Sequence, residues 1–125
     1  MLTRRTSLRS AVAVLGVGAA IALSTTVATP AFAANEGTYY GTWGSCAATE
    51  EIQVQYVQGG YHDQMEFFPT TTGARCGYRL LNNGNIIWAS PSAGTGWVYD
   101  GPTNYMCPQI YDLSTGIVKW QGVCN

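Results

Sequence analysis

Apolar and polar residues alternate along much of the chain beyond residue 36, in short runs separated by turn residues. The clearest alternation precedes Gly59-Gly60, which predicts a two-residue turn between two strands. Counting outward from this turn sets Val54 opposite Met65 and Ile52 opposite Phe67, so the apolar sets of both strands meet on one face. A second strand face, rich in glutamine and glutamate, is then left to solvent.

Asn83-Gly84 between two apolar runs predicts another hairpin, because both residues readily adopt the positive φ of a type I′ turn. The cross-strand pairs that follow are Leu81 with Ile86, Leu80 with Ile87, Arg79 with Trp88 and Tyr78 with Ala89. Opposed residues share a face. One face is expected in the core, with Cys76, Tyr78, Leu80, Ile87 and Ala89. The other is apolar yet charged and holds Arg79, Leu81, Ile86 and Trp88.

A third hairpin is expected to turn at Thr115-Gly116. Its register pairs Cys107 with Cys124, Tyr111 with Trp120, Leu113 with Val118 and Asp112 with Lys119. Four cysteines allow three pairings. This register selects Cys107–Cys124, which leaves Cys46–Cys76 for the second disulfide.

The remaining segments complete an all-β domain. Residues 37–46 predict a glycine-rich edge strand, followed by a connection over residues 47–50. Residues 91–95 predict a loop and residues 96–99 a short strand. About eight short antiparallel strands in hairpins, with no helical periodicity, indicate a small closed barrel or a two-sheet sandwich.

Residues 1–33 predict a cleaved secretory signal peptide. Three arginines precede an apolar stretch over residues 11–23 that is too short to span a bilayer, and Ala31-Phe32-Ala33 is a small-x-small cleavage site. Both the general secretory route and the twin-arginine route fit this leader. The working protein is therefore expected to be extracellular, with residues 34–125 as its single domain, and two disulfides agree with that compartment.

Charge excludes some partners. The leader removes three of the six basic residues, which leaves Arg75, Arg79 and Lys119 against seven acidic residues, a formal charge of −4. Such a domain lacks the basic footprint for nucleic acid or an anionic membrane. No Cys-x-x-Cys motif is present and no histidine lies near a cysteine, so neither a metal nor another cofactor is expected.

Catalysis finds little support in the sequence. His62 is the only histidine, and it is expected to lie exposed beside the Gly59-Gly60 turn, opposite Val57. Six carboxylates are expected in turns or on solvent-facing positions: Glu50, Glu51, Asp63, Glu66, Asp100 and Asp112. A small secreted ribonuclease could use Glu66, Arg75, Arg79 and His62 around a phosphate. The acidic charge and the missing second histidine argue against that hydrolase.

A binding function fits the sequence better than catalysis does, and two surfaces are candidates for the contact. The first is the face with Arg79, Trp88, Leu81 and Ile86, where a guanidinium over an indole would contribute roughly 0.5–2 kcal/mol. The second is the loop over residues 70–76, in which Arg75 beside Cys76 would suit a trypsin-like pocket.

The sequence therefore predicts a secreted, non-catalytic binding protein. It would contact another extracellular protein, as an inhibitor of an extracellular hydrolase of the kind found among small two-disulfide bacterial proteins, or as a subunit of a secreted assembly. The alternative is a carbohydrate- or cell-wall-binding module with a platform of Tyr39, Tyr40, Trp43, Trp97 and Tyr99. A small secreted hydrolase is the third hypothesis.

Overall fold

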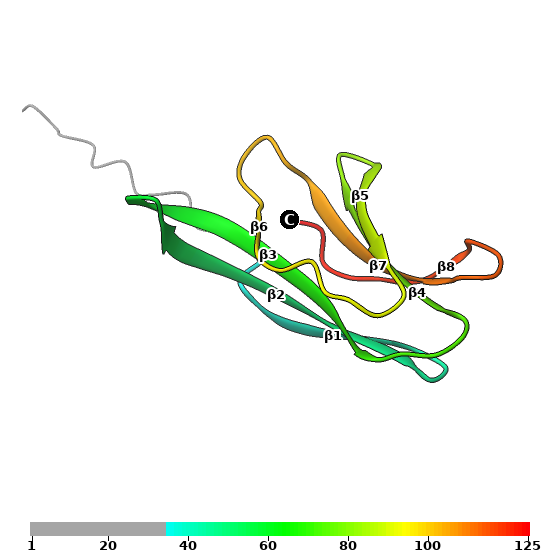
Figure 1. The fold of residues 1–125 in the computed structure, drawn as a ribbon. Helices are drawn as coiled ribbons and strands as arrows, with labels where there is room; N and C mark the ends of the chain where they lie inside the picture. The colour runs from blue at the N-terminus through cyan, green and yellow to red at the C-terminus, as the bar shows by residue number, and fades with distance from the viewer. Residues whose placement is uncertain (1–34) are drawn as a thin grey trace, which may run out of the picture.

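The computed structural model describes residues 35–125, so the predicted signal peptide over residues 1–33 lies outside the described residues. This part of the chain forms eight strands and no helix. Their bounds are β1 Gly37–Trp43, β2 Cys46–Val57, β3 Gly60–Thr71, β4 Cys76–Asn82, β5 Asn85–Ser90, β6 Val98–Tyr99, β7 Met106–Asp112 and β8 Val118–Gln121. They pair into two antiparallel sheets, β1-β2-β3-β6 and β5-β4-β7-β8, which form two layers (Figure 1). The all-β prediction is confirmed, and of its two forms the structure is the two-sheet sandwich.

The first hairpin turns one residue earlier than the sequence predicted. Gln58 and Gly59, at φ 52° and 85°, form the two-residue turn, and Gly60 begins β3. The register is therefore displaced by two residues from the predicted one, so that Ile52 faces Met65 instead of Phe67. A displacement of two leaves every side chain on its predicted face. The expected connection over residues 47–50 was wrong, because β2 begins at Cys46 and runs through it.

The second hairpin turns at Asn83-Gly84 as predicted, with φ of 50° and 80°. Leu81 faces Ile86, but a β-bulge follows, so that Leu80 faces Trp88 and Arg79 faces Ala89. The predicted pairing of Arg79 with Trp88 was therefore wrong. One extra residue in β5 turns Trp88 into the core and leaves Arg79 on the opposite side of the sheet.

The third hairpin also departs from its predicted register. Ile110 faces Trp120, and Tyr111 faces Val118 beyond another bulge. The expected ion pair of Asp112 with Lys119 was wrong, since Asp112 binds Arg75 instead. Past β8 the predicted register returns: the backbones of Met106 and Asn125 exchange hydrogen bonds of 2.7 and 3.0 Å. Cys107 therefore lies opposite Cys124, with the Cα atoms 4.4 Å apart.

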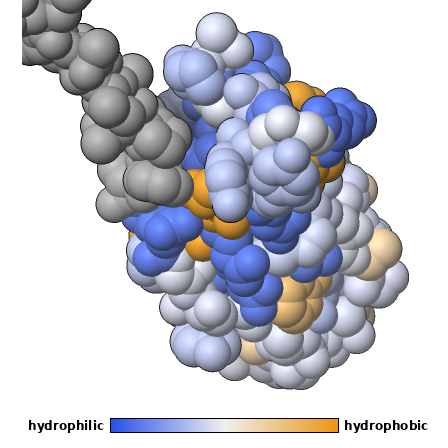
Figure 2. All heavy atoms as spheres, turned by 90° about the vertical axis from the view of Figure 1, so that its left-hand side faces the viewer, coloured by the Kyte–Doolittle hydropathy of each residue, from blue (hydrophilic) through white to orange (hydrophobic). Residues whose placement is uncertain are grey.

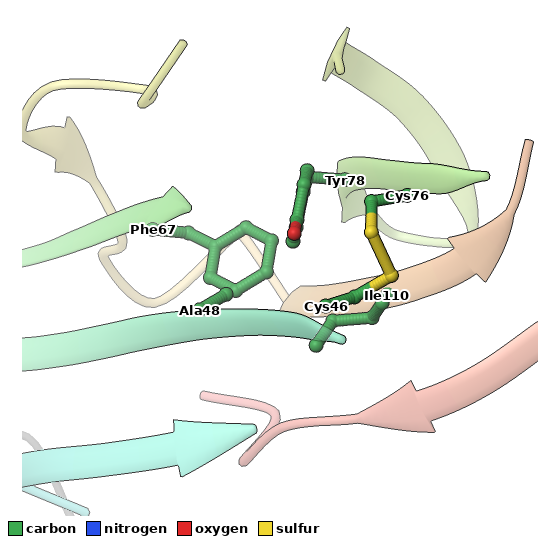
Figure 3. Close-up of a cluster of buried hydrophobic side chains, with 6 residues drawn as sticks. All are labelled: Cys46, Ala48, Phe67, Cys76, Tyr78 and Ile110. Atoms are coloured by element: carbon green, nitrogen blue, oxygen red, sulfur yellow. A yellow bond between two sulfur atoms is a disulfide. The ribbon is translucent and has the colours of Figure 1, made fainter. Parts of the chain in front are cut away.

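Both predicted disulfides are confirmed. Cys46–Cys76 joins β2 of one sheet to β4 of the other and lies inside the larger core cluster (Figure 3). That cluster consists of Cys46, Ala48, Phe67, Cys76, Tyr78 and Ile110. A second cluster consists of Ile52, Met65, Leu80 and Met106. Trp88 packs against both clusters, so the bulge in β5 supplies the indole that connects them.

Candidate functional site

The outer face of the β5-β4-β7-β8 sheet is the strongest candidate for a binding surface. Tyr78, Leu80 and Ile110 point into the core, so the residues between them point outward. Cross-strand pairing extends this alternation to β5 and β8. We call this surface the Arg79 face, defined by Arg79, Leu81, Ile86, Ala89, Gln109, Tyr111, Val118 and Gln121.

Arg79 is held in place by its neighbours on this face. Its Nε donates to Gln109 Oε1 at 2.7 Å, and Gln109 Nε2 donates in turn to Gln121 Oε1 at 2.8 Å. The guanidinium carbon lies 4.6 Å from the ring centroid of Tyr111. That ring lies across Gly77, where a Cβ atom would come within 2.4 Å of Tyr111 Cζ. Two contacts therefore orient the guanidinium before any partner arrives.

Exposed aliphatic side chains share this face with Arg79 and its glutamine partners. Among residues 35–125, the ion pair joins Arg75 to Asp112. Arg79 therefore has no acidic partner within these residues. Ile86 and Val118 on this face are 56% and 39% exposed, and Leu81, opposite Ile86, is partly exposed. The face thus combines an oriented, unpaired cation with exposed aliphatic side chains.

The predicted contact residues are only partly brought together. Arg79, Leu81 and Ile86 share the face, whereas Trp88 lies on its opposite side. Arg75, the other predicted contact, is exposed but hydrogen-bonds to the buried carboxylate of Asp112 and lies 5.6 Å from the Trp43 ring. The backbone oxygen of Arg75 also accepts from Leu113 N–H at 2.9 Å, so this residue is tied to its own domain.

The neighbourhood of Asp112 favours its ionised form. The Arg75 guanidinium and the Ser114 hydroxyl donate to the carboxylate and hold its pKa well below the usual range. Asp112, which the sequence placed in a turn or at a solvent-facing position, is in fact buried. Asp112 and Arg75 therefore form a structural pair, which explains why Arg75 is not offered as a free contact.

The outer face of the other sheet carries a shallow groove of ≈ 520 Å³ near the β2–β3 turn. It is lined by Val57, Gln58, His62, Gln64 and Tyr99. His62 lies opposite Gln55 rather than Val57, half-buried, with its ring 5.5 Å from that of Tyr99. The groove offers amide, imidazole and phenol groups, but no nucleophile beside the histidine.

Three carboxyl groups that the sequence placed in turns or at solvent-facing positions lie together at one end of the sandwich. Glu50 is 0% and Asp100 is 3% exposed, and Asp63 lies near them. One oxygen of each carboxyl, Glu50 Oε1, Asp63 Oδ1 and Asp100 Oδ1, is buried without a hydrogen-bond partner among the described residues. Burial, and the charge of neighbouring carboxyls, raise the pKa of Glu50 and of Asp100 to about 7.

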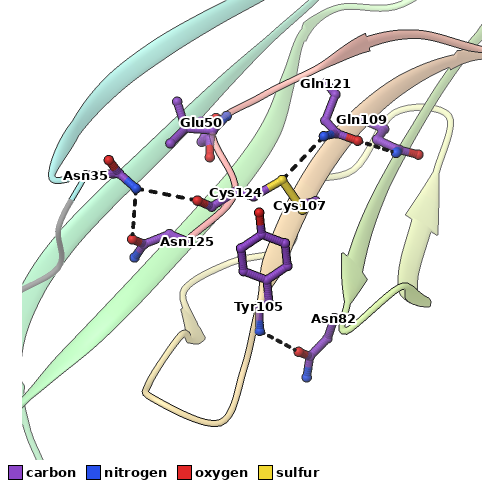
Figure 4. The surroundings of a disulfide bond; sticks show 10 residues. Asn35, Glu50, Asn82, Tyr105, Cys107, Gln109, Gln121, Cys124 and Asn125 are labelled. Atoms are coloured by element: carbon purple, nitrogen blue, oxygen red, sulfur yellow. Dashed lines mark hydrogen bonds between the residues drawn. A yellow bond between two sulfur atoms is a disulfide. The ribbon is translucent and has the colours of Figure 1, made fainter.

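These carboxyl groups hold the last residues of the chain, and Figure 4 shows Glu50 beside this segment. Glu50 Oε2 accepts from Val123 N–H at 2.9 Å. The Asn125 side-chain amide donates to Asp63 at 3.2 Å and to Asp100 at 3.0 Å. At the surface of this end, small hydrophobic patches lie among hydrophilic side chains (Figure 2).

A signal for Glu50 was available in the sequence. Ala48, Glu50 and Ile52 have the same parity, so an unbroken strand through them points all three inward. The predicted connection over residues 47–50 concealed this signal. Asp100 follows a two-residue strand, and no local pattern marks it as buried.

The structure separates the four residues of the ribonuclease hypothesis. His62 and Glu66 lie on the outer face of one sheet, whereas Arg79 lies on that of the other and Arg75 is paired with Asp112. The ribonuclease grouping was therefore wrong. Across residues 35–125, no three histidine, cysteine or acidic side chains are placed to hold a metal ion together. The same part of the chain forms no helix long and apolar enough to cross a membrane.

Comparison with known proteins identifies no relative: no family model, no curated protein and no solved structure matches the chain.

Proposed function

We propose that the chain is a secreted, non-catalytic binding protein that contacts another extracellular protein through the Arg79 face. The two disulfides agree with an extracellular location. The partner surface would present a carboxylate within an apolar surround, because that chemistry complements an unpaired arginine among aliphatic side chains. An inhibitor of a secreted hydrolase and a subunit of a secreted assembly both act in this way.

The observation that carries the proposal is the orientation of Arg79 by Gln109 and Tyr111. Immobilising a long side chain costs roughly 0.5–1.5 kcal/mol on binding, and here the domain itself has met much of that cost. The Arg79 Nε–H donates to Gln109 within the domain, so the two terminal nitrogens of the guanidinium remain to bind a carboxylate. Arginine within an apolar surround is a common centre of protein interfaces.

The test begins with capture of partners from the culture medium of the source organism on the immobilised protein, followed by identification by mass and purification. Dissociation constants are then measured for the wild type, Arg79→Ala and Lys119→Ala. Lys119 is the matched control, because it is an exposed cation whose ammonium lies 5.3 Å from the Trp43 ring rather than on the Arg79 contact. We expect Arg79→Ala to raise the dissociation constant at least tenfold and Lys119→Ala less than twofold. Equal effects of the two substitutions would refute the proposed face.

A carbohydrate-binding role is the second candidate, and the groove beside His62 and Tyr99 is the observation that favours it. The platform expected from the sequence is reduced, because Tyr39 and Trp43 pack against the core clusters. Tyr40, Trp97 and Tyr99 remain exposed. This role requires retention on chitin, cellulose or peptidoglycan, and loss of that retention in Tyr99→Ala; absence of retention on all three eliminates it.

A further inference from the structure

The C-terminal segment Gly122–Asn125 is fastened by carboxyl groups of the opposite sheet. Val123 donates its N–H to Glu50 at 2.9 Å, and its side chain packs against the second core cluster. Asn125 bridges Asp63 and Asp100 through its side-chain amide. Gly122 permits the close approach, since a Cβ atom there would lie 2.2 Å from Glu50 Oε2.

Among residues 35–125, the charged side chains that face this segment are acidic, and the neutral side-chain amide of Asn35 donates to Cys124 O at 3.5 Å and to Asn125 Oδ1 at 3.3 Å. Glu50 comes from β2, Asp63 from β3 and Asp100 from the residue after β6, and Glu36 before β1 adds its charge to that of Asp63. The phenol of Tyr39 on β1 donates to the Asn35 backbone oxygen at 2.9 Å. In the described part of the chain, the basic residues contact other groups: Arg75 binds Asp112, Arg79 binds Gln109 and Lys119 lies beside Trp43.

Such a cluster is compatible with burial only while part of it is protonated. Two or more buried carboxylates without a cation repel one another and lose their hydration. Burial is the main cause of the raised pKa of Glu50 and of Asp100, each about 7. Glu50 and Asp100 are therefore mostly neutral in mild acid and become charged above neutral pH.

The same segment is connected to the Arg79 face by a chain of hydrogen bonds (Figure 4). Gln121 Nε2 donates to Cys124 Sγ at 3.4 Å, and Gln121 Oε1 accepts from Gln109 at 2.8 Å. Gln109 Oε1 accepts from Arg79 Nε at 2.7 Å. Movement of the segment at Cys124 would thus reach the group that orients Arg79.

We propose that the carboxyl cluster makes segment 122–125 a pH-responsive clamp on the Arg79 face, closed in mild acid and loosened above neutral pH. The Cys107–Cys124 disulfide keeps the loosened segment attached to β7. The consequence for binding rests on the proposed function of the Arg79 face, whereas the clamp itself is a property of the free protein.

The clamp is tested on the free protein by hydrogen exchange of the Val123 and Asn125 backbone amides, expressed as protection factors to remove the intrinsic pH dependence. We expect protection to fall at least tenfold between pH 5.5 and pH 8.5 in the wild type. Glu50→Gln, which cannot ionise, should reduce that fall to less than threefold. Glu51→Gln is the matched control, because Glu51 is the next residue and points to the outer face opposite Glu66. Constant protection in the wild type, or an equal effect of both substitutions, would overturn the clamp.

Two further readouts keep the proposal decidable if Glu50→Gln fails to fold. The wild-type carboxyl carbon resonance of Glu50 should titrate near neutral pH, and a midpoint in the ordinary range for glutamate would refute the clamp. The Nε–H resonance of Arg79 should lose protection together with Val123 in the wild type and should become independent of Val123 in Gln121→Ala. Arg79 protection that never follows Val123 would refute the connection to the face. None of these outcomes depends on a partner, so failure of the clamp and failure of the proposed function are distinguishable.

Discussion

Glu50 and Asp112 are both buried carboxylates, and their surroundings give them opposite effects on stability. Arg75 and Ser114 stabilise the charged form of Asp112, which lowers its pKa. Glu50 accepts one backbone hydrogen bond and is otherwise desolvated, which raises its pKa to about 7. The stabilisation from Asp112 is present above the ordinary pKa of aspartate and is lost as pH falls below it. The stabilisation from Glu50 is present below the ordinary pKa of glutamate and is lost as pH rises through about 7.

The free energy of unfolding should therefore be greatest in mild acid. Between pH 5.5 and pH 8.5, Glu50→Gln should lose about 2 kcal/mol less stability than the wild type, since glutamine carries no titrating proton. Urea unfolding at the two pH values measures this difference. Glu51→Gln should retain the wild-type slope, and a Glu50→Gln slope equal to that of the wild type would show that Glu50 is ionised throughout.

The burial of individual acidic side chains was the property that the sequence predicted least well. Glu50, Asp100 and Asp112 were all expected near solvent, and all three are buried. Residue type favours exposure for acids, because an isolated buried charge is costly. What keeps these residues inside is specific and distant in sequence: Arg75 for Asp112, and residues 122–125 for the others.

At the scale of elements, Gly77 shows how a strand position without a side chain shapes the candidate face. The Tyr111 ring lies across it, and Arg79 lies over that ring. Gly77→Ala should cost about 1–3 kcal/mol, because the new Cβ would meet Tyr111 Cζ at 2.4 Å and must displace the ring. Urea unfolding measures the cost.

Gly60→Ala is the control for that substitution, because the nearest atom to its Cβ would be His62 Nε2, at 3.3 Å. We expect it to cost less than half as much. A Gly77→Ala protein as stable as Gly60→Ala would mean that Tyr111 does not depend on Gly77 for its position.

Hairpins were predictable as elements, but their registers were predicted less well. Asn83-Gly84 fixed its turn because both residues tolerate positive φ cheaply. In the first hairpin, Gln58 takes positive φ in place of Gly60, which no propensity favours. In the second, the bulge in β5 arises from packing, since it brings Trp88 onto both core clusters. A bulge driven by distant contacts leaves no local signal, and it separated Trp88 from Arg79.

At the scale of the whole molecule, the sandwich gives the domain two unlike outer surfaces. One sheet presents glutamine, glutamate and His62, and the other presents Arg79 among aliphatic residues. The disulfides were predictable because their partners follow from a hairpin and from elimination. The pairing of β4 with β7 joins segments distant in sequence, and no local pattern could reveal it.

The most direct test of the account is hydroxyl-radical footprinting of the complex with the captured partner, read by mass spectrometry. We predict that oxidation of Leu81, Ile86 and Tyr111 falls at least threefold on binding. Tyr56 and Tyr61, which are exposed on the β2–β3 hairpin of the other sheet, should be oxidised as in the free protein. Protection of these two tyrosines with Tyr111 unchanged would place the partner on the wrong sheet and contradict the Arg79 face as the binding surface.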